Sequence, residues 1–287
     1  MFSKKALYCF LAVFSSSMAI FFKKIALLGN IDPLRLLLQF MIIAAIMLTI
    51  NLLLFQKKYI IQIKKIKISE WKMIFLAGFF LFAAYLASTY GLRFTTSINY
   101  SFIIRSTLIF STILSFFFMG ERMYWQMLLL IVSSFLGVYL VSTEGQIIIP
   151  RAGDLFILMG AFFFASFAMA QKIVNQYIPP ELISWGVISS SAFYSILVGI
   201  LFKVNIFSTD SLFIICIIGI FEGLVILFMN QALKITSVTY YYLMTMLMPV
   251  INGFLGIVFL NESFKLIQIL GGIILIVSVI LAQRLKF

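Results

Sequence analysis

The stretch GLRFTTSINY, from Gly91 to Tyr100, recurs 141 residues later as ALKITSVTYY, from Ala232 to Tyr241. At the same spacing, FFFMGERM at 116–123 aligns with IVFLNESF at 257–264, and nine of the 51 ungapped positions from residue 91 to 141 are identical. Self-similarity at a fixed spacing is the signature of an internal repeat. The chain is therefore expected to consist of two related halves.

The composition indicates that both halves lie in a membrane. Of the 287 residues, 63% are hydrophobic and only 10% are charged. Soluble domains carry about a quarter of charged residues, so this chain lacks the charge to cover a water-exposed surface. A membrane barrel would show segments of about ten residues with alternating polarity, and that pattern is missing from this sequence. The predicted fold is an all-α integral membrane protein.

Apolar runs of about 20 residues, the length that a helix needs to cross the hydrocarbon core, predict ten transmembrane helices. The runs cover residues 6–27, 34–56, 72–92, 95–119, 123–143, 154–177, 182–203, 211–233, 237–260 and 264–284. Five helices fall in each repeat, 6–143 and 154–284, and an odd number forces the second repeat to be inverted relative to the first. Inverted repeats around a site at the membrane midplane are typical of secondary transporters.

The Lys and Arg residues predict the orientation. Thirteen of them lie on the side of the two termini, including the cluster from Lys57 to Lys72, and seven lie on the other side. Positively charged loops stay in the cytoplasm. We therefore expect a multi-pass protein of the plasma or inner membrane with both termini in the cytoplasm.

Several classes of function are disfavoured by what the sequence lacks. It has no His, and its two Cys residues, Cys9 and Cys216, show no metal-ligand spacing. We expect no metal and no cofactor. The net charge of +12 comes from clusters between apolar runs, which argues against a nucleic-acid partner. The expected partners are a small-molecule substrate and the lipid bilayer, in a monomer or homodimer, and no ATP-binding motif is present.

Two polar motifs in corresponding places, YGLRFTTS at 90–97 and QALKITSV at 231–238, lead into the fourth and ninth predicted helices. With Gly120-Glu121, Asn261-Glu262 and Met248-Pro249-Val250, they make the chain resemble the ten-helix EamA-like group of the drug/metabolite transporter superfamily. The resemblance implies a central cavity surrounded by the third, fourth, eighth and ninth helices. An acidic residue commonly precedes this Pro in the family, and Met248 stands in its place here, so a cation-binding role is not carried over.

Two ionisable residues are expected near the bilayer centre, where a charge is costly and marks a functional site. Arg105 lies in the fourth predicted helix and Glu222 in the eighth. The resemblance implies that both can face the cavity, where Arg105 would bind a substrate carboxylate and Glu222 an ammonium group or a coupling proton. The structural alternative is that Arg105 and Glu222 pair with each other, or with the backbone, to hold the bundle together.

Further candidates share helix faces with these residues or carry large polar groups. Ser101 lies one turn before Arg105, and a polar stripe in the ninth helix comprises Tyr242, Thr245, Pro249 and Asn252. Pro249 frees a backbone carbonyl for a substrate or a hinge, and Tyr85 is expected at the cavity. Small polar residues also mediate helix packing in lipid. We expect Lys23 and Lys24 to snorkel to the headgroups.

The sequence thus predicts a secondary transporter, not an enzyme, that carries small zwitterionic or amphiphilic metabolites such as amino acids by alternating access. Proton coupling through Glu222 and uncoupled facilitation both stay open. An alternative is a carrier of phosphorylated metabolites or nucleotide sugars, which would use Arg105 with Lys23 or Lys24. A membrane-embedded lipid-modifying enzyme would need His, Asp or Cys clustered at one membrane face, and the sequence shows no such cluster. A scaffold or receptor would need neither buried charges nor an inverted repeat.

Overall fold

The computed structural model describes residues 4–29, 31–94, 100, 102–120, 124–147, 151–205, 211–260 and 265–284. Within these ranges the secondary structure is helical and no strand occurs, which confirms the predicted all-α fold. The helices in chain order are α1 (Lys4–Leu28), α2 (Pro33–Phe55), α3 (Lys57–Ile63), α4 (Ile68–Arg93), the 3₁₀ turn η1 (Ile104–Ser106), α6 (Thr107–Met119), α7 (Trp125–Thr143), α8 (Gly153–Val174), α9 (Pro180–Leu201), α10 (Leu212–Ile235), α11 (Val238–Thr245), α12 (Met248–Leu260) and α13 (Leu266–Arg284).

Seven helices in the described part of the chain are long and apolar enough to cross a membrane, namely α1, α2, α4, α7, α8, α9 and α10. Two further apolar helices, Ile104–Met119 and Leu266–Ala282, are shorter. The expected multi-pass membrane protein is therefore confirmed. The predicted number of ten membrane helices is not confirmed, because the fourth and ninth predicted spans are each interrupted and the apolar part of the tenth, Leu266–Ala282, is shorter.

The ninth predicted span, 237–260, is divided into α11 and α12. Its interruption has a covalent cause, because Pro249 has no N–H and cannot continue the helical hydrogen bonding. The backbone tightens around the break, where the amides of Met246 and Leu247 bond to carbonyls three residues back, at 3.1 and 3.2 Å. The polar stripe expected along one continuous helix is consequently shared between two shorter ones.

The fourth predicted span, 95–119, contains the turn η1 before α6 begins at Thr107. Leu108 stands where the ninth span has its proline, so this interruption has another origin. The Thr107 hydroxyl donates to the Ile104 carbonyl at 2.7 Å, and a hydroxyl that bonds back to the preceding turn bends a helix. Residues 95–99 at the start of this span lie outside the described residues.

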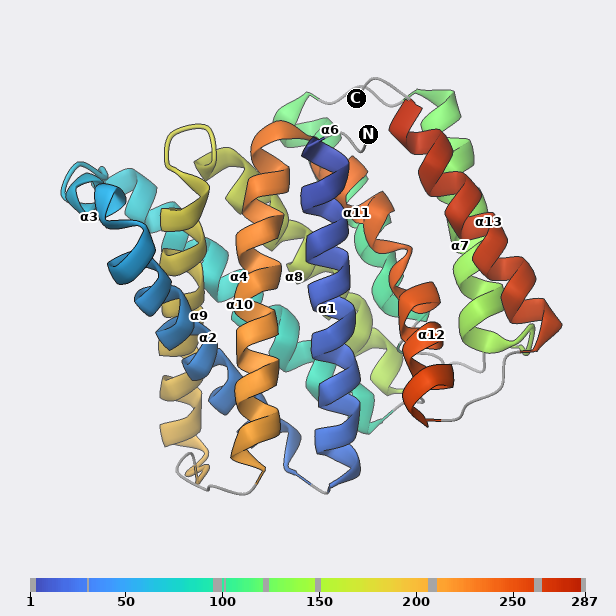
Figure 1. Ribbon diagram of the computed structural model, residues 1–287, viewed down its shortest axis with the longest axis horizontal. Helices are drawn as coiled ribbons and strands as arrows, with labels where there is room; N and C mark the ends of the chain where they lie inside the picture. Colours follow the sequence, from blue (N-terminus) through green and yellow to red (C-terminus); the bar gives the residue numbers. More distant parts are fainter. Residues whose placement is uncertain are drawn as a thin grey trace.

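The lysine cluster between the second and third predicted spans is partly helical, whereas it was expected to be a loop. It contains the short helix α3, and α4 begins at Ile68 instead of residue 72. The start of α4 is stabilised by Glu70, whose carboxylate accepts a hydrogen bond from the Lys67 amide at 2.8 Å. Figure 1 shows α3 at the end of the bundle where α1 begins and α13 finishes.

The long helices pack in two matching sets. Helix α4 contacts α8 and α9, α10 contacts α1 and α2, and α7 lies beside α13 at one edge (Figure 1). Glycines allow the closest approaches. A Cβ atom on Gly78 of α4 would lie 2.8 Å from Ser190 Cβ of α9, and one on Gly219 of α10 would lie 2.6 Å from Ile43 Cγ2 of α2.

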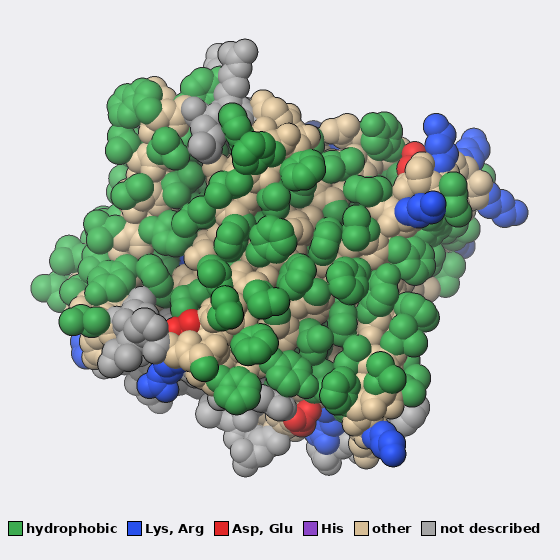
Figure 2. Space-filling view, turned by 180° about the vertical axis from the view of Figure 1, so that it is seen from behind, with side chains coloured by type: hydrophobic (Ala, Val, Ile, Leu, Met, Phe, Trp, Pro, Cys, Tyr) green, Lys and Arg blue, Asp and Glu red, His purple; other side chains and the backbone are tan. Residues whose placement is uncertain are grey.

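The outer surface of the bundle is apolar. Figure 2 shows a face covered by hydrophobic side chains, with Lys and Arg gathered toward its margins. Large apolar residues are extensively exposed on several helices, for example Phe117 at 74% and Phe213 at 78%. Exposure on this scale would be unfavourable in water, and it is the surface that a bilayer requires.

Candidate functional site

The candidate site is built around an ion pair inside the bundle, between helices α1 and α10. The Lys23 amine, in the last third of α1, pairs with carboxylate oxygen Oε1 of Glu222, near the middle of α10. The side chains are only 18% and 5% exposed, respectively. These residues are brought together because α1 and α10 pack along each other. A carboxylate is tolerated inside a membrane protein when an opposite charge accompanies it.

Aromatic side chains complete the surroundings of this ion pair. The Tyr85 hydroxyl of α4 donates to the second Glu222 oxygen, Oε2, at 2.6 Å. The Lys23 amine lies 4.2 Å from the ring centroid of Phe40 and 4.7 Å from that of Tyr85, within the range of cation–π attraction. We call Lys23, Glu222, Tyr85 and Phe40 the charge cluster. Its four side chains come from α1, α2, α4 and α10, so the cluster depends on the packing of these four helices.

Phe164 of α8 connects the charge cluster to α11. The Tyr85 ring meets the Phe164 ring edge to face, with centroids 5.1 Å apart. The Tyr242 hydroxyl of α11 donates to the Phe164 carbonyl at 2.7 Å. Tyr85 and Tyr242, which the sequence predicted at one cavity, therefore contact the same residue, although the Tyr242 hydroxyl is committed to backbone.

Arg105 occupies a separate position. Its Nη1 atom donates to the Thr245 backbone carbonyl at 3.4 Å and lies 3.3 Å from Met248 Sδ. Nε is buried and has no hydrogen-bond partner among the described residues. The alternative in which Arg105 pairs with Glu222 is not found in this structure, where the Glu222 carboxylate is bound by Lys23 and Tyr85. The alternative that Arg105 binds backbone matches the geometry.

The remaining predicted residues are distributed around the break between α11 and α12. The Thr245 hydroxyl donates back to the Tyr242 carbonyl at 2.6 Å, and Pro249 is the second residue of α12. The Asn252 oxygen Oδ1 is buried and has no hydrogen-bond partner within the described part of the structure. Ser101 lies outside the described residues, so its predicted role is untested.

Lys23 lies in a different environment from the headgroup region predicted for it. It does not reach toward headgroups, because its amine is bound to Glu222. The residues after Lys23 indicate its position in the sequence, because the apolar run Ile25 to Leu28 continues α1 beyond it. Five further helical residues put Lys23 more than one turn inside the helix, where its amine has a neighbouring helix within reach.

Two lysines on the predicted cytoplasmic side, Lys172 and Lys234, bind backbone carbonyls at helix ends. The Lys172 amine of α8 donates to the carbonyls of Leu233 and Thr236 at the end of α10. In return, the Lys234 amine of α10 donates to the carbonyl of Asn175, the residue that caps α8. Cations at helix C-termini satisfy free carbonyls and oppose the helix dipole. The ends of α8 and α10 therefore cap each other.

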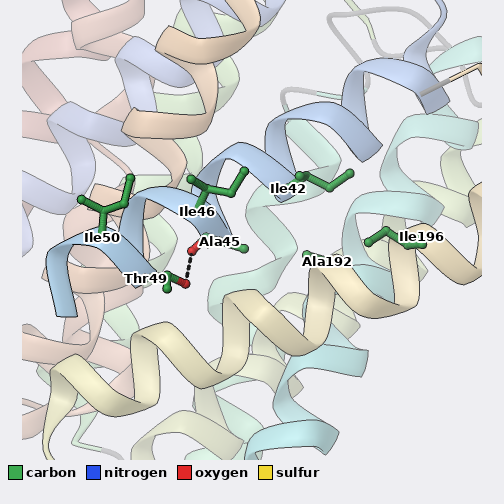
Figure 3. A pocket seen from close by; sticks show the side chains of 7 residues that line it. All are labelled: Ile42, Ala45, Ile46, Thr49, Ile50, Ala192 and Ile196. Carbon is green, nitrogen blue, oxygen red and sulfur yellow. Dashed lines mark hydrogen bonds between the residues drawn. The ribbon is translucent and has the colours of Figure 1, made fainter. Parts of the chain in front are cut away.

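A groove between α2 and α9, with a volume of about 280 Å³, has a different character (Figure 3). Its lining residues are Ile42, Ala45, Ile46, Thr49, Ile50, Ala192 and Ile196. Its polar member, Thr49, donates to the Ala45 carbonyl at 2.7 Å and accepts from the Trp185 indole at 3.0 Å. Ile46 and Ile50 are about half exposed on the bundle surface. The groove presents apolar side chains and belongs to the lipid-facing surface.

The side chains of the charge cluster can bind charged groups but are not arranged for catalysis of a covalent reaction. It offers one ammonium, one carboxylate, one phenol hydroxyl and two aromatic faces, and none of these is an activated nucleophile. Among the described residues, no group of three or more His, Cys, Asp or Glu side chains is placed to hold a metal ion. The site is suited to binding and releasing a polar molecule within an apolar bundle.

Comparison with known proteins gives the same class of function. The model of the EamA-like transporter family matches the chain twice, over residues 3–143 and over residues 151–283. A solved crystal structure aligns with a TM-score of 0.82 over 100% of both chains, at 16% sequence identity. At that identity the likeness concerns the fold alone. No curated protein matches the chain significantly.

Proposed function

The chain belongs to the EamA-like transporter family, within the drug/metabolite transporter superfamily, and we propose that it carries a small zwitterionic metabolite, such as an amino acid, by alternating access. We place it in the plasma or inner membrane with both termini in the cytoplasm. The Lys and Arg distribution supports this orientation. So does the position of the lysine-rich helix α3, at the same end of the bundle as the start of α1 and the end of α13 (Figure 1).

We further propose that the protein consists of two inverted repeats, and three observations support this. The family model matches two successive segments of similar length. Helices α6 and α12 both have 13 residues and start 141 residues apart, and α7 and α13 both have 19 residues and also start 141 residues apart. The close-packing glycines Gly78 and Gly219 have the same spacing. Rocking of one repeat against the other would expose a central site alternately to each side.

The single observation that carries the proposed substrate class is the buried ion pair between Lys23 and Glu222. A zwitterion can insert into such a pair without creating an unpaired charge in the bundle. Its ammonium group replaces Lys23 at the Glu222 carboxylate, and its carboxylate pairs with the Lys23 amine. The Phe40 and Tyr85 rings lie beside the exchanging ammonium groups. In this arrangement Lys23 takes the role that the sequence assigned to Arg105.

The same pair offers a way to couple transport to protons. A proton on Glu222 would remove the negative charge that holds Lys23. The freed Lys23 could then turn toward a substrate carboxylate, and the Tyr85 hydroxyl would still bond to the protonated acid. Coupling of this kind predicts that a pH gradient drives substrate accumulation by the wild type, and that the residual exchange of Glu222→Gln does not respond to the gradient.

The test is counterflow in liposomes containing the purified protein, loaded in turn with amino acids, polyamines, nucleotides and sugar phosphates. We expect exchange of zwitterionic amino acids, and loss of at least tenfold in rate for Lys23→Met and Glu222→Gln, as removal of a charged hydrogen bond of 1.5 kcal/mol or more implies. The matched control is Lys265→Met, which removes an exposed ion pair with Glu144 and should retain the rate.

Two outcomes would change this proposal. Unchanged flux in both Lys23→Met and Glu222→Gln, for every accepted substrate, would show that the ion pair is not the binding site. Exchange of sugar phosphates or nucleotides in place of amino acids would favour the anion carrier. The incomplete hydrogen bonding of the Arg105 guanidinium supports that second candidate, because a phosphate group would use its remaining donors.

A further inference from the structure

We propose that Arg105 is a positioning residue that replaces the hydrogen bond lost at Pro249 and so links the two interrupted helices of the bundle. This inference goes beyond the proposed substrate and does not depend on it. It concerns the contact between η1, which precedes α6, and the junction of α11 with α12.

The carbonyl that Arg105 contacts is the one that proline chemistry leaves unbonded. In an α-helix the amide of residue 249 would donate to the carbonyl of residue 245, four positions earlier. Pro249 has no N–H, so the Thr245 carbonyl loses this donor. Arg105 Nη1 lies 3.4 Å from that same oxygen. In an apolar interior an unsatisfied carbonyl is costly, and the guanidinium supplies the missing donor.

The positive charge adds to this interaction. Thr245 is the last residue of α11, and the carbonyl end of a helix carries a partial negative charge that a cation stabilises. The same Nη1 atom also lies 3.3 Å from Met248 Sδ, its second contact at the junction of α11 and α12. Arg105 therefore caps α11 from outside the helix, as a lysine or arginine does at many helix C-termini.

The contact also joins corresponding places in the two proposed repeats. Arg105 and Ser106 lie in the 3₁₀ turn of the first half, and residues 141 positions later, Met246 and Leu247, form the break of the second half. The side chain leaves one interruption and ends at the other. Because α6 and α11 pack together, the two breaks lie next to each other. A movement of one repeat relative to the other that separated α6 from α11 would have to release Arg105 from Thr245.

A double-mutant cycle tests this role, because Pro249→Ala restores the amide donor that Arg105 replaces. Hydrogen exchange is followed at the Val250 and Ile251 amides, which bond to the Leu247 carbonyl just after the break. We expect Arg105→Met to accelerate their exchange about tenfold, a change equivalent to 1.4 kcal/mol. In the Pro249→Ala background the same substitution should change exchange less than twofold. Arg105→Lys, which retains a cationic donor, should recover part of the protection.

The result that overturns the proposal is an Arg105→Met effect of equal size with and without Pro249. Counterflow on the same variants separates this role from substrate binding. A substrate-binding arginine would raise KM for carboxylate-bearing substrates in both backgrounds and leave exchange at Val250 and Ile251 unchanged, and this too would contradict the proposal. A change in maximal rate at constant KM, removed by Pro249→Ala, would support it.

Discussion

Lys23 and Arg105 are both basic residues within the bundle, and their surroundings give them different roles. Lys23 has a full countercharge, because Glu222 pairs with it and Tyr85 holds the second carboxylate oxygen. Arg105 has a neutral carbonyl and a sulfur atom as its hydrogen-bond partners. Breaking an ion pair leaves an unpaired charge, whereas removing Arg105 leaves an unpaired carbonyl, which costs less.

At the residue scale we predict a strong non-additivity between Lys23 and Glu222. Lys23→Met or Glu222→Gln alone should lower the free energy of unfolding by about 3–5 kcal/mol, because each leaves one charge buried without its partner. The double variant should lie close to the wild type. Thermal unfolding in detergent measures all three proteins. The exposed Lys265 and Glu144 pair is the control, with an expected effect of about 0–1 kcal/mol, and additive losses at Lys23 and Glu222 would contradict the ion pair.

At the scale of helices, the bundle is held by close contacts at small residues. In lipid the hydrophobic effect does not drive one apolar helix onto another, so packing and interhelical hydrogen bonds decide the contacts. Gly78 and Gly219 permit α4 and α10 to approach α9 and α2 closely. Between α7 and α13, Gly137 lies against Gly271, and Ser133 is hydrogen bonded to Ser278 at 2.8 Å. These contacts determine which helices are neighbours.

We predict that Gly→Ala substitutions lower the stability of the protein where a glycine lies against a neighbouring helix, and do not lower it where the glycine has space around it. Gly78→Ala and Gly219→Ala should each destabilise the protein by about 1–3 kcal/mol, because the new Cβ would overlap side-chain atoms of α9 or α2. Gly272→Ala is the control. Its nearest atom, Val250 Cγ2, would be 3.7 Å away, so the higher helix propensity of Ala should leave stability unchanged or raised by up to about 1 kcal/mol. Equal melting temperatures for all three variants would contradict these helix contacts.

At the scale of the whole molecule, the charges lie at the margins of an apolar surface (Figure 2). The two ends of the bundle differ, since the lysine-rich segment around α3 lies at one of them (Figure 1). The inside-positive rule assigns that end to the cytoplasm. The exposed Arg151, before α8, belongs to the opposite side in the predicted topology.

The predicted orientation is tested by cysteine labelling. Lys64→Cys and Arg151→Cys both introduce an exposed thiol, whereas the native Cys9 is buried and Cys216 is half-buried in α10. On intact cells, a membrane-impermeant maleimide should label Arg151→Cys. It should label Lys64→Cys only after the cells are permeabilised, because the α3 end is expected to face the cytoplasm. The opposite pattern would mean that the protein is inserted the other way.

The sequence by itself determined the helical fold and its membrane environment. Apolar runs of about 20 residues with so few charges leave the helix as the form that satisfies every backbone group in lipid. It also indicated that Pro249 frees a backbone carbonyl, because a missing N–H is a property of one residue, although it predicted one continuous helix there. The internal repeat followed from residue types at a fixed spacing, and the family from the resemblance of the quoted motifs, without any knowledge of contacts.

Only the tertiary structure decided which polar groups meet. Lys23 and Glu222 are 199 residues apart in the chain, and the sequence suggested a substrate ammonium group, a proton or Arg105 as the partner of Glu222. The choice depends on α1 packing beside α10 and on η1 lying at the end of α11, and such contacts arise from side-chain fit between helices. Periodicity shows which residues share a helix face, but it does not show which helix that face meets. For this reason the sequence identified Glu222 as a buried carboxylate, whereas its partner Lys23 became evident only in the folded bundle.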